Sequence, residues 1–177
     1  LFPKTKVTIG PYLENRFYYD FDVETPFTEE DLLKIEDEMT KISEENLQIT
    51  NEIKSRDDSI SYFEKINENY KVEIINDLDP NETLKVYSQG EFTDLCRGPH
   101  VPYTGVIKHF KLLSSSAAYW RGDEKNQTLQ RVYGTSFQNI KDLKKYLLML
   151  EEQKKRDHRK IGKELDLFFF DDEVGPG

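Results

Sequence analysis

The residues best suited to chemistry lie close together in one short stretch of the chain, residues 94–100. It contains Asp94, the single cysteine Cys96, and His100, which is one of three histidines. Strand-forming residues lead into it and a Gly-Pro pair interrupts it, so the sequence predicts a loop that brings the thiol and the imidazole to one point. These groups suit a soft metal, a proton relay or a polar substrate pocket. The alternative interpretation is a buried cysteine beside a surface histidine.

Two kinds of site are compatible with these residues. A hydrolytic site needs a positioned water, a group that accepts its proton, and a cation or donor for the developing oxyanion. His100 or Asp94 could accept the proton, and Lys71 could orient the water or stabilise the oxyanion. A zinc site needs three or four ligands, whereas Cys96 and His100 supply two, so the others would come from His109 or from outside the chain. Spacing alone does not show whether these side chains meet.

Length and charge restrict the possible functions. The chain has 177 residues and a formal net charge of -9. This length allows one sizeable core, and the negative charge argues against a dedicated high-affinity nucleic-acid binder, which is usually basic. Basic side chains concentrate in residues 141–163, so a negatively charged polymer is expected to contact that segment or to be held by parts outside the chain. A single cysteine excludes an internal disulfide and favours a reducing compartment.

The two ends suggest a piece of a longer protein. The first residue is not methionine, and no basic-then-apolar signal pattern follows it. The last residues are turn formers directly after an aromatic run. No run approaches the roughly 20 apolar residues that span a bilayer, so no membrane contact is expected. Both ends are therefore interpreted as cuts through a larger chain.

The hydrophobic pattern predicts an α+β fold, with a mostly antiparallel sheet and packed helices. A helix should begin at Thr28, whose capping box with Asp31 precedes apolar residues at helical spacing, and a shorter helix at Ser55. Residues 70–75 are β-prone and predict a strand, with Lys71 on a solvated edge. The other strands are predicted at residues 6–9, 17–23, 47–53, 85–87, 92–96, 106–113, 117–120 and 129–133.

A long helix is predicted from Asn139 to about Lys163, with one apolar stripe in its first half. Its second half is nearly all charged and contains His158, which is expected to be exposed rather than catalytic. A helix with so little to bury is typical of a connection between two domains. Residues 165–170 are apolar again and are expected to pack against sequence beyond Gly177.

Several motifs along the chain together resemble threonyl-tRNA synthetase. The clearest is the stretch that contains the cysteine and histidine, residues 94–102. The other matching segments are residues 9–11, 17–20, 109–112, 118–123, 129–135 and 155–162. Independent motifs that match in order are far more specific than a single pattern. The chain is therefore identified as similar to this family over essentially its whole length.

The resemblance implies three parts. Residues 1–137 resemble the editing domain, or second additional domain, which deacylates tRNA mischarged with serine. Residues 138–164 resemble the linker helix, and residues 165–177 resemble the start of the class II catalytic domain. In the family, an HxxxH pair just before the position of Leu1 also contributes to the editing cleft. The chain by itself is therefore expected to be impaired in editing.

The resemblance also implies roles for individual residues. Positions of the family's hydrolytic pocket match Lys71, Asp94 and His100, which become the candidate catalytic residues. The candidate substrate-binding residues are Cys96, Tyr18 and Tyr19. If zinc binds in the cleft, the candidate ligands are Cys96 and His100.

No cofactor is expected in this region. ATP, magnesium and a zinc ion are expected in the parent enzyme's catalytic domain, outside this chain. The expected partners are the acceptor end of tRNA(Thr), the rest of the synthetase chain, and a second copy of the parent through its core. The expected location is the cytoplasm.

Three other readings remain open. The cysteine–histidine pattern is shared with free-standing editing proteins related to alanyl-tRNA synthetase, in which the cleft binds zinc. A second possibility is a module that docks the acceptor end of tRNA without hydrolysing anything. The third is a structural spacer.

Overall fold

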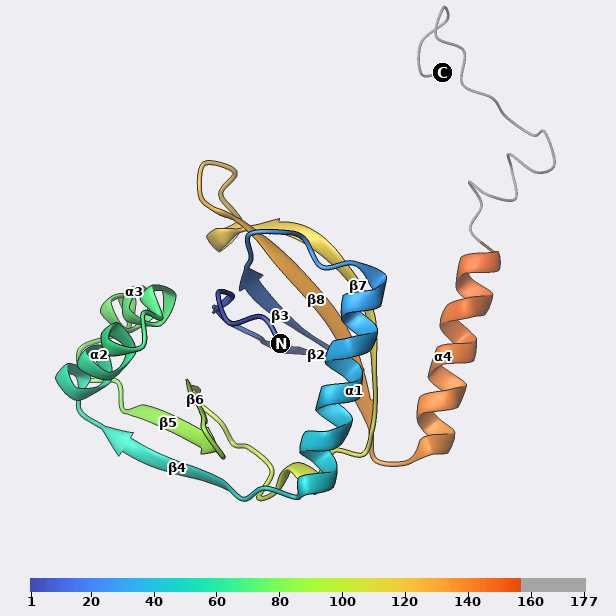
Figure 1. Cartoon of the computed structure of the whole chain (residues 1–177), viewed down its shortest axis with the longest axis horizontal. Coiled ribbons are helices and arrows are strands. Elements are labelled where there is room, and N and C mark those ends of the chain that lie inside the picture. The colour runs from blue at the N-terminus through green and yellow to red at the C-terminus, as the bar shows by residue number, and fades with distance from the viewer. Residues whose placement is uncertain (157–177) are drawn as a thin grey trace, which may run out of the picture. The chain divides into compact units, whose positions relative to one another are not determined.

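The computed structural model describes residues 1–156, which fall into two compact units, Leu1–Gln138 and a second unit that begins at Asn139. The first unit contains two antiparallel sheets and three α-helices (Figure 1), which confirms the predicted α+β fold. None of the helices within residues 1–156 is long and apolar enough to cross a membrane. The predictions for His158, for the end of the long helix and for residues 165–177 lie outside the described residues.

The larger sheet has the strand order β1-β3-β8-β7, with β2 also paired to β3, and every pairing is antiparallel. The predicted strands at residues 6–9 and 17–23 are therefore present and antiparallel to each other. The two strands predicted at residues 106–113 and 117–120 form one long strand, because small residues continue the pairing past a bulge after Leu112. The strands are β1 Lys6–Val7, β2 Tyr12–Leu13, β3 Arg16–Asp22, β7 His109–Tyr119 and β8 Thr128–Phe137.

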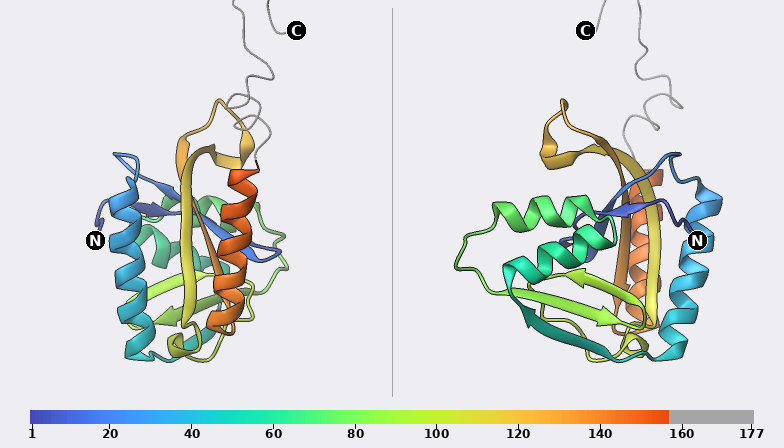
Figure 2. Two further views of the ribbon diagram at one scale, coloured as in Figure 1. Left: turned by 90° about the vertical axis from the view of Figure 1, so that its right-hand side faces the viewer. Right: turned by 60° about the vertical axis from the view of Figure 1, so that its left-hand side comes forward.

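Helix α1, Glu29–Glu45, packs on one face of this sheet (Figures 1 and 2). The predicted capping box is confirmed: the Asp31 backbone N–H donates to Thr28 Oγ1 at 3.2 Å, and the Thr28 N–H donates to Asp31 Oδ2 at 3.0 Å. The helix ends at Asn46, whose φ of 52° stops further helical hydrogen bonding. Its apolar face joins a core formed by Phe27, Leu32, Leu112 and Val132, with Phe17, Phe21, Ile35 and Met39 around them.

The smaller sheet has the order β4-β5-β6 and is covered by two short helices. Its strands are β4 Ile49–Lys54, β5 Leu84–Gln89 and β6 Phe92–Leu95, and the helices are α2 Arg56–Lys65 and α3 Asn69–Asp77. The predicted start of α2 is confirmed, because Ser55 accepts a hydrogen bond from the Asp58 N–H at 3.1 Å. The core between these helices and the sheet consists of Phe63, Ile75, Leu84 and Val86.

The strand predicted at residues 70–75 is wrong, because these residues form α3. Local β propensities span only about 1 kcal/mol per residue and depend on context, and here tertiary packing outweighs them. In a helix, positions four apart lie on the same face, and Lys71 and Ile75 are both buried in this way, at 2% and 0% exposure. The solvated edge predicted for Lys71 is therefore also wrong.

Two 3-10 turns and one further helix complete the described chain. The first turn is η1 Thr104–Val106, and the second is η2 Trp120–Gly122, directly after β7. Arg121 in η2 has a φ of 58°, in the left-handed region. In the second unit, α4 Ile140–Lys155 begins at Asn139, whose side chain accepts from the Asp142 N–H at 2.9 Å.

Candidate functional site

Lys71, Asp94 and Tyr19 come from three different elements and meet at one point. Lys71 Nζ lies 2.5 Å from Asp94 Oδ1 and donates to the Tyr19 hydroxyl at 3.0 Å. The Tyr19 hydroxyl in turn donates to Asp94 Oδ2 at 2.7 Å. These side chains belong to α3, β6 and β3, so the two sheets and one helix must all be in place before they touch. We refer to this closed set of contacts as the Lys71 triangle.

Burial strengthens the electrostatic attraction between the charged groups of the Lys71 triangle. The side chain of Lys71 is 2% exposed and that of Asp94 is 14% exposed. A buried ammonium group requires such a carboxylate partner, since removing an unpaired charge from water is very unfavourable. Burial, and after it the Asp94 charge, raises the pKa of the Tyr19 phenol well above its ordinary value. Tyr19 is therefore a neutral hydrogen-bond donor at physiological pH.

Within residues 1–156, the contacts made by the Asp94 carboxylate leave one acceptor position open. Besides Lys71 and Tyr19, the backbone N–H of Leu95 donates to Asp94 Oδ1 at 2.7 Å. An ionised carboxylate offers about four acceptor positions, of which these contacts occupy three. The position that is left lies on Oδ2 and suits a water or a donor group of a substrate.

A hollow of about 180 Å³ lies against the Lys71 triangle. Its lining combines Tyr19 from the larger sheet with Asp94 and Tyr87 from the smaller sheet and His100 from the loop that follows β6. Lys71 does not line the hollow itself, but its ammonium group contacts two residues that do, Asp94 and Tyr19. The other lining residues are Ile49, Ser88, Gln89 and Phe92.

His100 is held at this hollow by a ring-on-ring contact. Its imidazole stacks on the phenol of Tyr87, with ring centroids 3.9 Å apart and an angle of 19° between the planes. The loop can reach Tyr87 because Gly98 has a φ of 69°, and a Cβ there would clash with the Tyr87 hydroxyl. Partial burial against Tyr87 lowers the pKa of His100, while the Asp94 charge opposes this shift. His100 is therefore mainly a neutral base at pH 7.

Comparison with known proteins gives this geometry a context. Residues 84–133 match the family described as the threonyl and alanyl tRNA synthetase second additional domain. Over 177 residues the chain is 59% identical to threonine–tRNA ligase from Pelobacter propionicus and 58% identical to that from Citrifermentans bemidjiense. Over 174 residues it is 55% identical to the same enzyme from Rickettsia peacockii. The chain matches one region of the threonyl-tRNA synthetases along its length.

The match covers only part of these synthetases. It takes in 98–100% of this chain but 27–28% of each relative. The segment that matches the second additional domain runs from β5 into β8 and includes Asp94 and His100. Two members of the Lys71 triangle, Lys71 and Tyr19, lie before that segment.

The two predicted metal ligands, Cys96 and His100, lie in different surroundings. Cys96 is half-buried and its Sγ accepts from the backbone N–H of Gly98 at 3.4 Å, so the thiol supports the turn of the loop. It does not line the hollow that contains His100. Within residues 1–156, no three side chains of the metal-binding types are grouped so that they could hold an ion.

The two tyrosines predicted to bind substrate point to opposite faces of the larger sheet, because they are neighbours in β3. Tyr19 reaches the hollow. Tyr18 instead stacks against Arg131, whose guanidinium carbon lies 3.9 Å from the centre of the Tyr18 ring. Arg131 Nε also pairs with Asp20 Oδ1 at 2.7 Å. The structure thus brings Lys71, Asp94, His100 and Tyr19 together but places Tyr18 outside this group.

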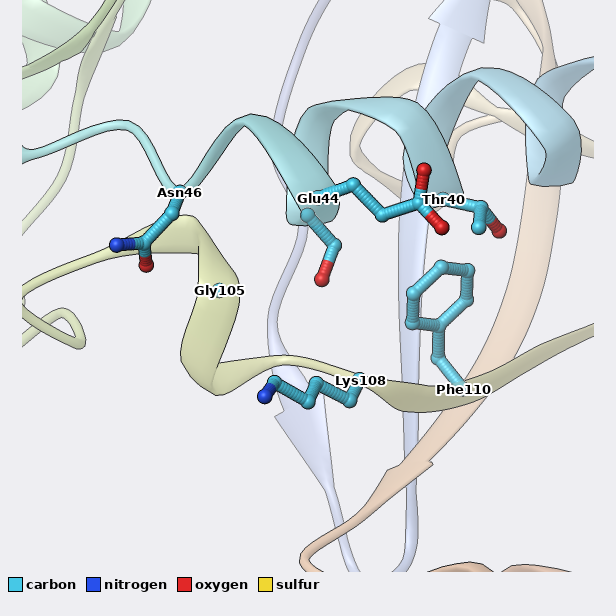
Figure 3. Close-up of a pocket in the computed structure, with 7 residues that line it drawn as sticks. Thr40, Glu44, Asn46, Gly105, Lys108 and Phe110 are labelled. Carbon is cyan, nitrogen blue, oxygen red and sulfur yellow. The ribbon is translucent and has the colours of Figure 1, made fainter.

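A larger hollow, of about 490 Å³, lies at the carboxyl end of α1 (Figure 3). Figure 3 shows that Thr40, Glu44 and Asn46 line it from the end of the helix, opposite Lys108 and Phe110. None of the residues predicted to be catalytic lines it. Size alone therefore does not mark the site in this synthetase region.

Tyr87 is a residue of the candidate site that sequence reasoning missed. It is 8% exposed, lines the hollow and carries the stacked ring of His100. Its position next to Val86 in a short, largely buried strand is typical of an ordinary core residue, so the local pattern held no sign of a role. The one available signal is its register, since Tyr87 pairs with Asp94 across β5 and β6.

Removing the Tyr87 ring is expected to weaken whatever reaction His100 serves, whereas removing only its hydroxyl is not. Misplacing a reacting group by about 1 Å lowers rates by as much as roughly 100-fold, so Tyr87→Leu should reduce kcat by at least about 10-fold, and Tyr87→Phe by less than about 3-fold. NMR provides a direct readout, because the ring current of residue 87 shifts the His100 ring protons and is lost only in the Leu variant.

Val86→Ala is the matched control for this prediction. Val86 is the neighbouring residue in β5, is 2% exposed, and points to the opposite face of the sheet. If this variant lost as much activity as Tyr87→Leu at a similar loss of stability, Tyr87 would be a core residue without a positioning role.

Proposed function

We propose that this region of the synthetase hydrolyses the ester bond of tRNA(Thr) mischarged with serine. The observation that carries the proposal is that Lys71 pairs with Asp94 and Tyr19, two residues that line the same hollow as His100. A neutral imidazole, a carboxylate with a free acceptor position and a buried cation are the groups that ester hydrolysis requires. The match to a synthetase second additional domain supports this assignment.

The need for such a site follows from the chemistry of the two amino acids. Serine is threonine without one methyl group, and a methyl group is worth only about 1–3 kcal/mol in a binding pocket. A synthesis site that accepts threonine therefore accepts serine too often. A small second site admits the smaller product and excludes the larger one by collision with the extra methyl group. The hollow beside the Lys71 triangle has a volume of about 180 Å³ and suits a small side chain.

In the proposed reaction, a water donates one hydrogen bond to the free acceptor position of Asp94 and another to His100. Its oxygen attacks the ester carbonyl carbon while its proton passes to the neutral imidazole. The bond between the carbonyl carbon and the ribose oxygen then breaks, and the imidazolium returns a proton to that oxygen. The neighbouring ribose hydroxyl is a second route for this proton. The products are serine and uncharged tRNA.

The remaining residues orient the reacting groups. Lys71 and Tyr19 fix both oxygens of Asp94, and the Lys71 charge favours the developing oxyanion from behind the lining of the hollow. Cys96 supports the loop that carries His100 through its contact with the Gly98 N–H. The thiol does not act as a nucleophile in this proposal.

The proposal extends to the whole enzyme, of which this chain spans about a quarter. We propose that the complete protein joins threonine to tRNA(Thr), the reaction for which its relatives are named, and that it does so in the cytoplasm. ATP, magnesium and zinc would bind in a catalytic domain beyond residues 1–156, through which two copies would also pair. The acceptor end of the tRNA would move from that domain to the hollow described above.

The deciding experiment compares hydrolysis of seryl-tRNA(Thr) and threonyl-tRNA(Thr) by the complete synthetase. We expect the seryl ester to be cleaved at least about 10-fold faster, since one methyl group must separate the two substrates. Equal rates, or a seryl rate no faster than spontaneous hydrolysis, would contradict the proposal; binding without hydrolysis would then identify a docking module. Loss of activity with a chelator and its return with zinc would instead indicate the metal-dependent chemistry of alanyl-type editing proteins.

A further inference from the structure

The turn between β7 and β8 makes polar contacts with the outer side of α3. The Trp120 Nε1–H donates to Glu73 Oε1 at 3.1 Å, and the Arg121 guanidinium lies 3.0 Å from the same oxygen. Arg121 also pairs with Asp77, one helical turn further along α3. The right-hand view of Figure 2 shows this turn next to the helix. We refer to Trp120, Arg121, Glu73 and Asp77 as the clasp.

Contacts beside the clasp tie the same side of α3 to the larger sheet. The rings of Tyr70 and Trp120 meet edge to face, with centroids 5.0 Å apart. The Tyr70 hydroxyl donates to Asp22 Oδ2 at 2.8 Å, at the end of β3. Just before the helix, Glu68 accepts from the Val7 N–H in β1 at 3.2 Å.

The opposite side of α3 packs against the smaller sheet through apolar residues. Ile75 is fully buried there, in the core that includes Leu84 and Val86 of β5. Helix α3 thus has an apolar attachment to one sheet and a polar attachment to the other. Lys71 leaves the helix between these attachments and joins Asp94 of the smaller sheet to Tyr19 of the larger one.

The helix has little intrinsic support for this position. It has nine residues, and no side-chain hydrogen bond caps its start. A helix this short is not stable alone, so its placement depends on tertiary contacts. Without the polar contacts at the turn, α3 would keep only the weaker attachment to the larger sheet through Tyr70 and Glu68, and Lys71 would be less firmly fixed relative to Tyr19.

We propose that the clasp positions Lys71, holding α3 at the distance from the larger sheet at which the ammonium group reaches Asp94 and Tyr19 together. Trp120 and Arg121 are positioning residues, since neither lines the hollow. The effect on Lys71 itself is independent of any reaction. Its consequence for hydrolysis rests on the function proposed above.

The first test measures whether the clasp protects Lys71. The double variant Trp120→Phe with Arg121→Asn removes the indole donor and the guanidinium, and asparagine tolerates the left-handed conformation of residue 121. Lys71 is labelled with an amine-reactive reagent and quantified by mass spectrometry against Lys34, an exposed lysine on α1. We expect the relative labelling of Lys71 to rise at least about 5-fold, as expected when a buried segment opens locally.

Two control variants separate the effect of the clasp from loss of a surface charge and from general weakening of the core. Lys41→Asn removes one positive charge from an exposed ion pair on α1 and should leave Lys71 labelling unchanged. Val86→Ala weakens the core beneath α3 without touching the clasp. Unchanged labelling of Lys71 in the double variant, or an equal rise in Val86→Ala, would overturn the proposal.

The second test asks whether the clasp acts on hydrolysis through Lys71. In the complete synthetase, the double variant should lower the rate of seryl-tRNA deacylation by about 10-fold. In a Lys71→Met background the same changes should lower it by less than about 2-fold, because residues that act through one another are not additive. Equal losses in the two backgrounds would show a general structural role and overturn the proposal.

The two tests separate failure of this inference from failure of the proposed function. If the unaltered synthetase does not hydrolyse seryl-tRNA, the proposed function is wrong, and the labelling of Lys71 still decides the role of the clasp. If hydrolysis occurs but labelling and rate are unaffected by the double variant, the inference alone is wrong.

Discussion

His100→Ala is expected to slow seryl-tRNA deacylation by the complete synthetase by about 100- to 10,000-fold, the range that a positioned general base contributes. His100 is the neutral imidazole at the hollow, where partial burial lowers its pKa and leaves the ring able to accept a proton at pH 7. Alanine supplies no group to take the proton. Single-turnover deacylation measured at saturating enzyme isolates this step from tRNA binding.

His109→Ala is the matched control for this prediction. His109 is a half-buried histidine on β7 that does not line the hollow, so its removal deletes the same group away from the site. We expect its deacylation rate to stay within about 2-fold of the unaltered enzyme. An unchanged rate in His100→Ala, with tRNA binding intact, would favour a docking role for this region.

The second large effect concerns stability. Asp94→Ala is expected to lower the free energy of unfolding by about 3–5 kcal/mol, the usual result of removing one partner of a buried ion pair. Among residues 1–156, the ammonium of Lys71, 2% exposed, would then keep only the Tyr19 hydroxyl as a hydrogen-bond partner. Urea denaturation of the chain, followed by circular dichroism, measures the change.

Two further variants show whether the unpaired charge is responsible. Lys71→Met combined with Asp94→Leu removes both charges and should recover most of the loss, since apolar replacements of a buried pair are often neutral. Glu82→Ala deletes a carboxylate whose partner Arg97 is 80% exposed, and should change stability by less than about 1 kcal/mol. If the double variant were as unstable as Asp94→Ala alone, lost packing rather than charge would explain the result.

Local features of the fold were predictable from the sequence because their causes are local. The capping pairs at Thr28 and Ser55 use hydrogen bonds between residues three apart, and both are present. The strand predicted at residues 70–75 failed because the residues that hold α3 in place come from Val7, Asp22 and the turn after β7, far along the chain. No window of neighbouring residues contains those contacts.

The residues of the candidate site also differ in how far the sequence could predict them. Asp94 and His100 stand out in one short stretch, and Lys71 was a candidate from its chemistry, whereas Tyr19 was named only through the resemblance to a family. Lys71 is joined to Tyr19 across 52 positions of the sequence, and Tyr19 to Asp94 across 75. The sequence gives no signal for Tyr87, since an aromatic residue that stacks on another ring cannot be told from any other buried aromatic residue by its type or neighbours. Such a role depends on which side chain comes to lie against it.

The position of Lys71 and Tyr19 before residue 84 bears on how function is inferred for distant relatives. Proteins that match this chain only over the segment corresponding to residues 84–133 are matched at the positions of the carboxylate and the imidazole. They need not share the ammonium group and the phenol that hold the carboxylate in place. In such proteins, an upstream helix that places a lysine beside the carboxylate would indicate a site arranged like this one. Without that lysine, the fold could be similar although the proposed hydrolytic site is incomplete.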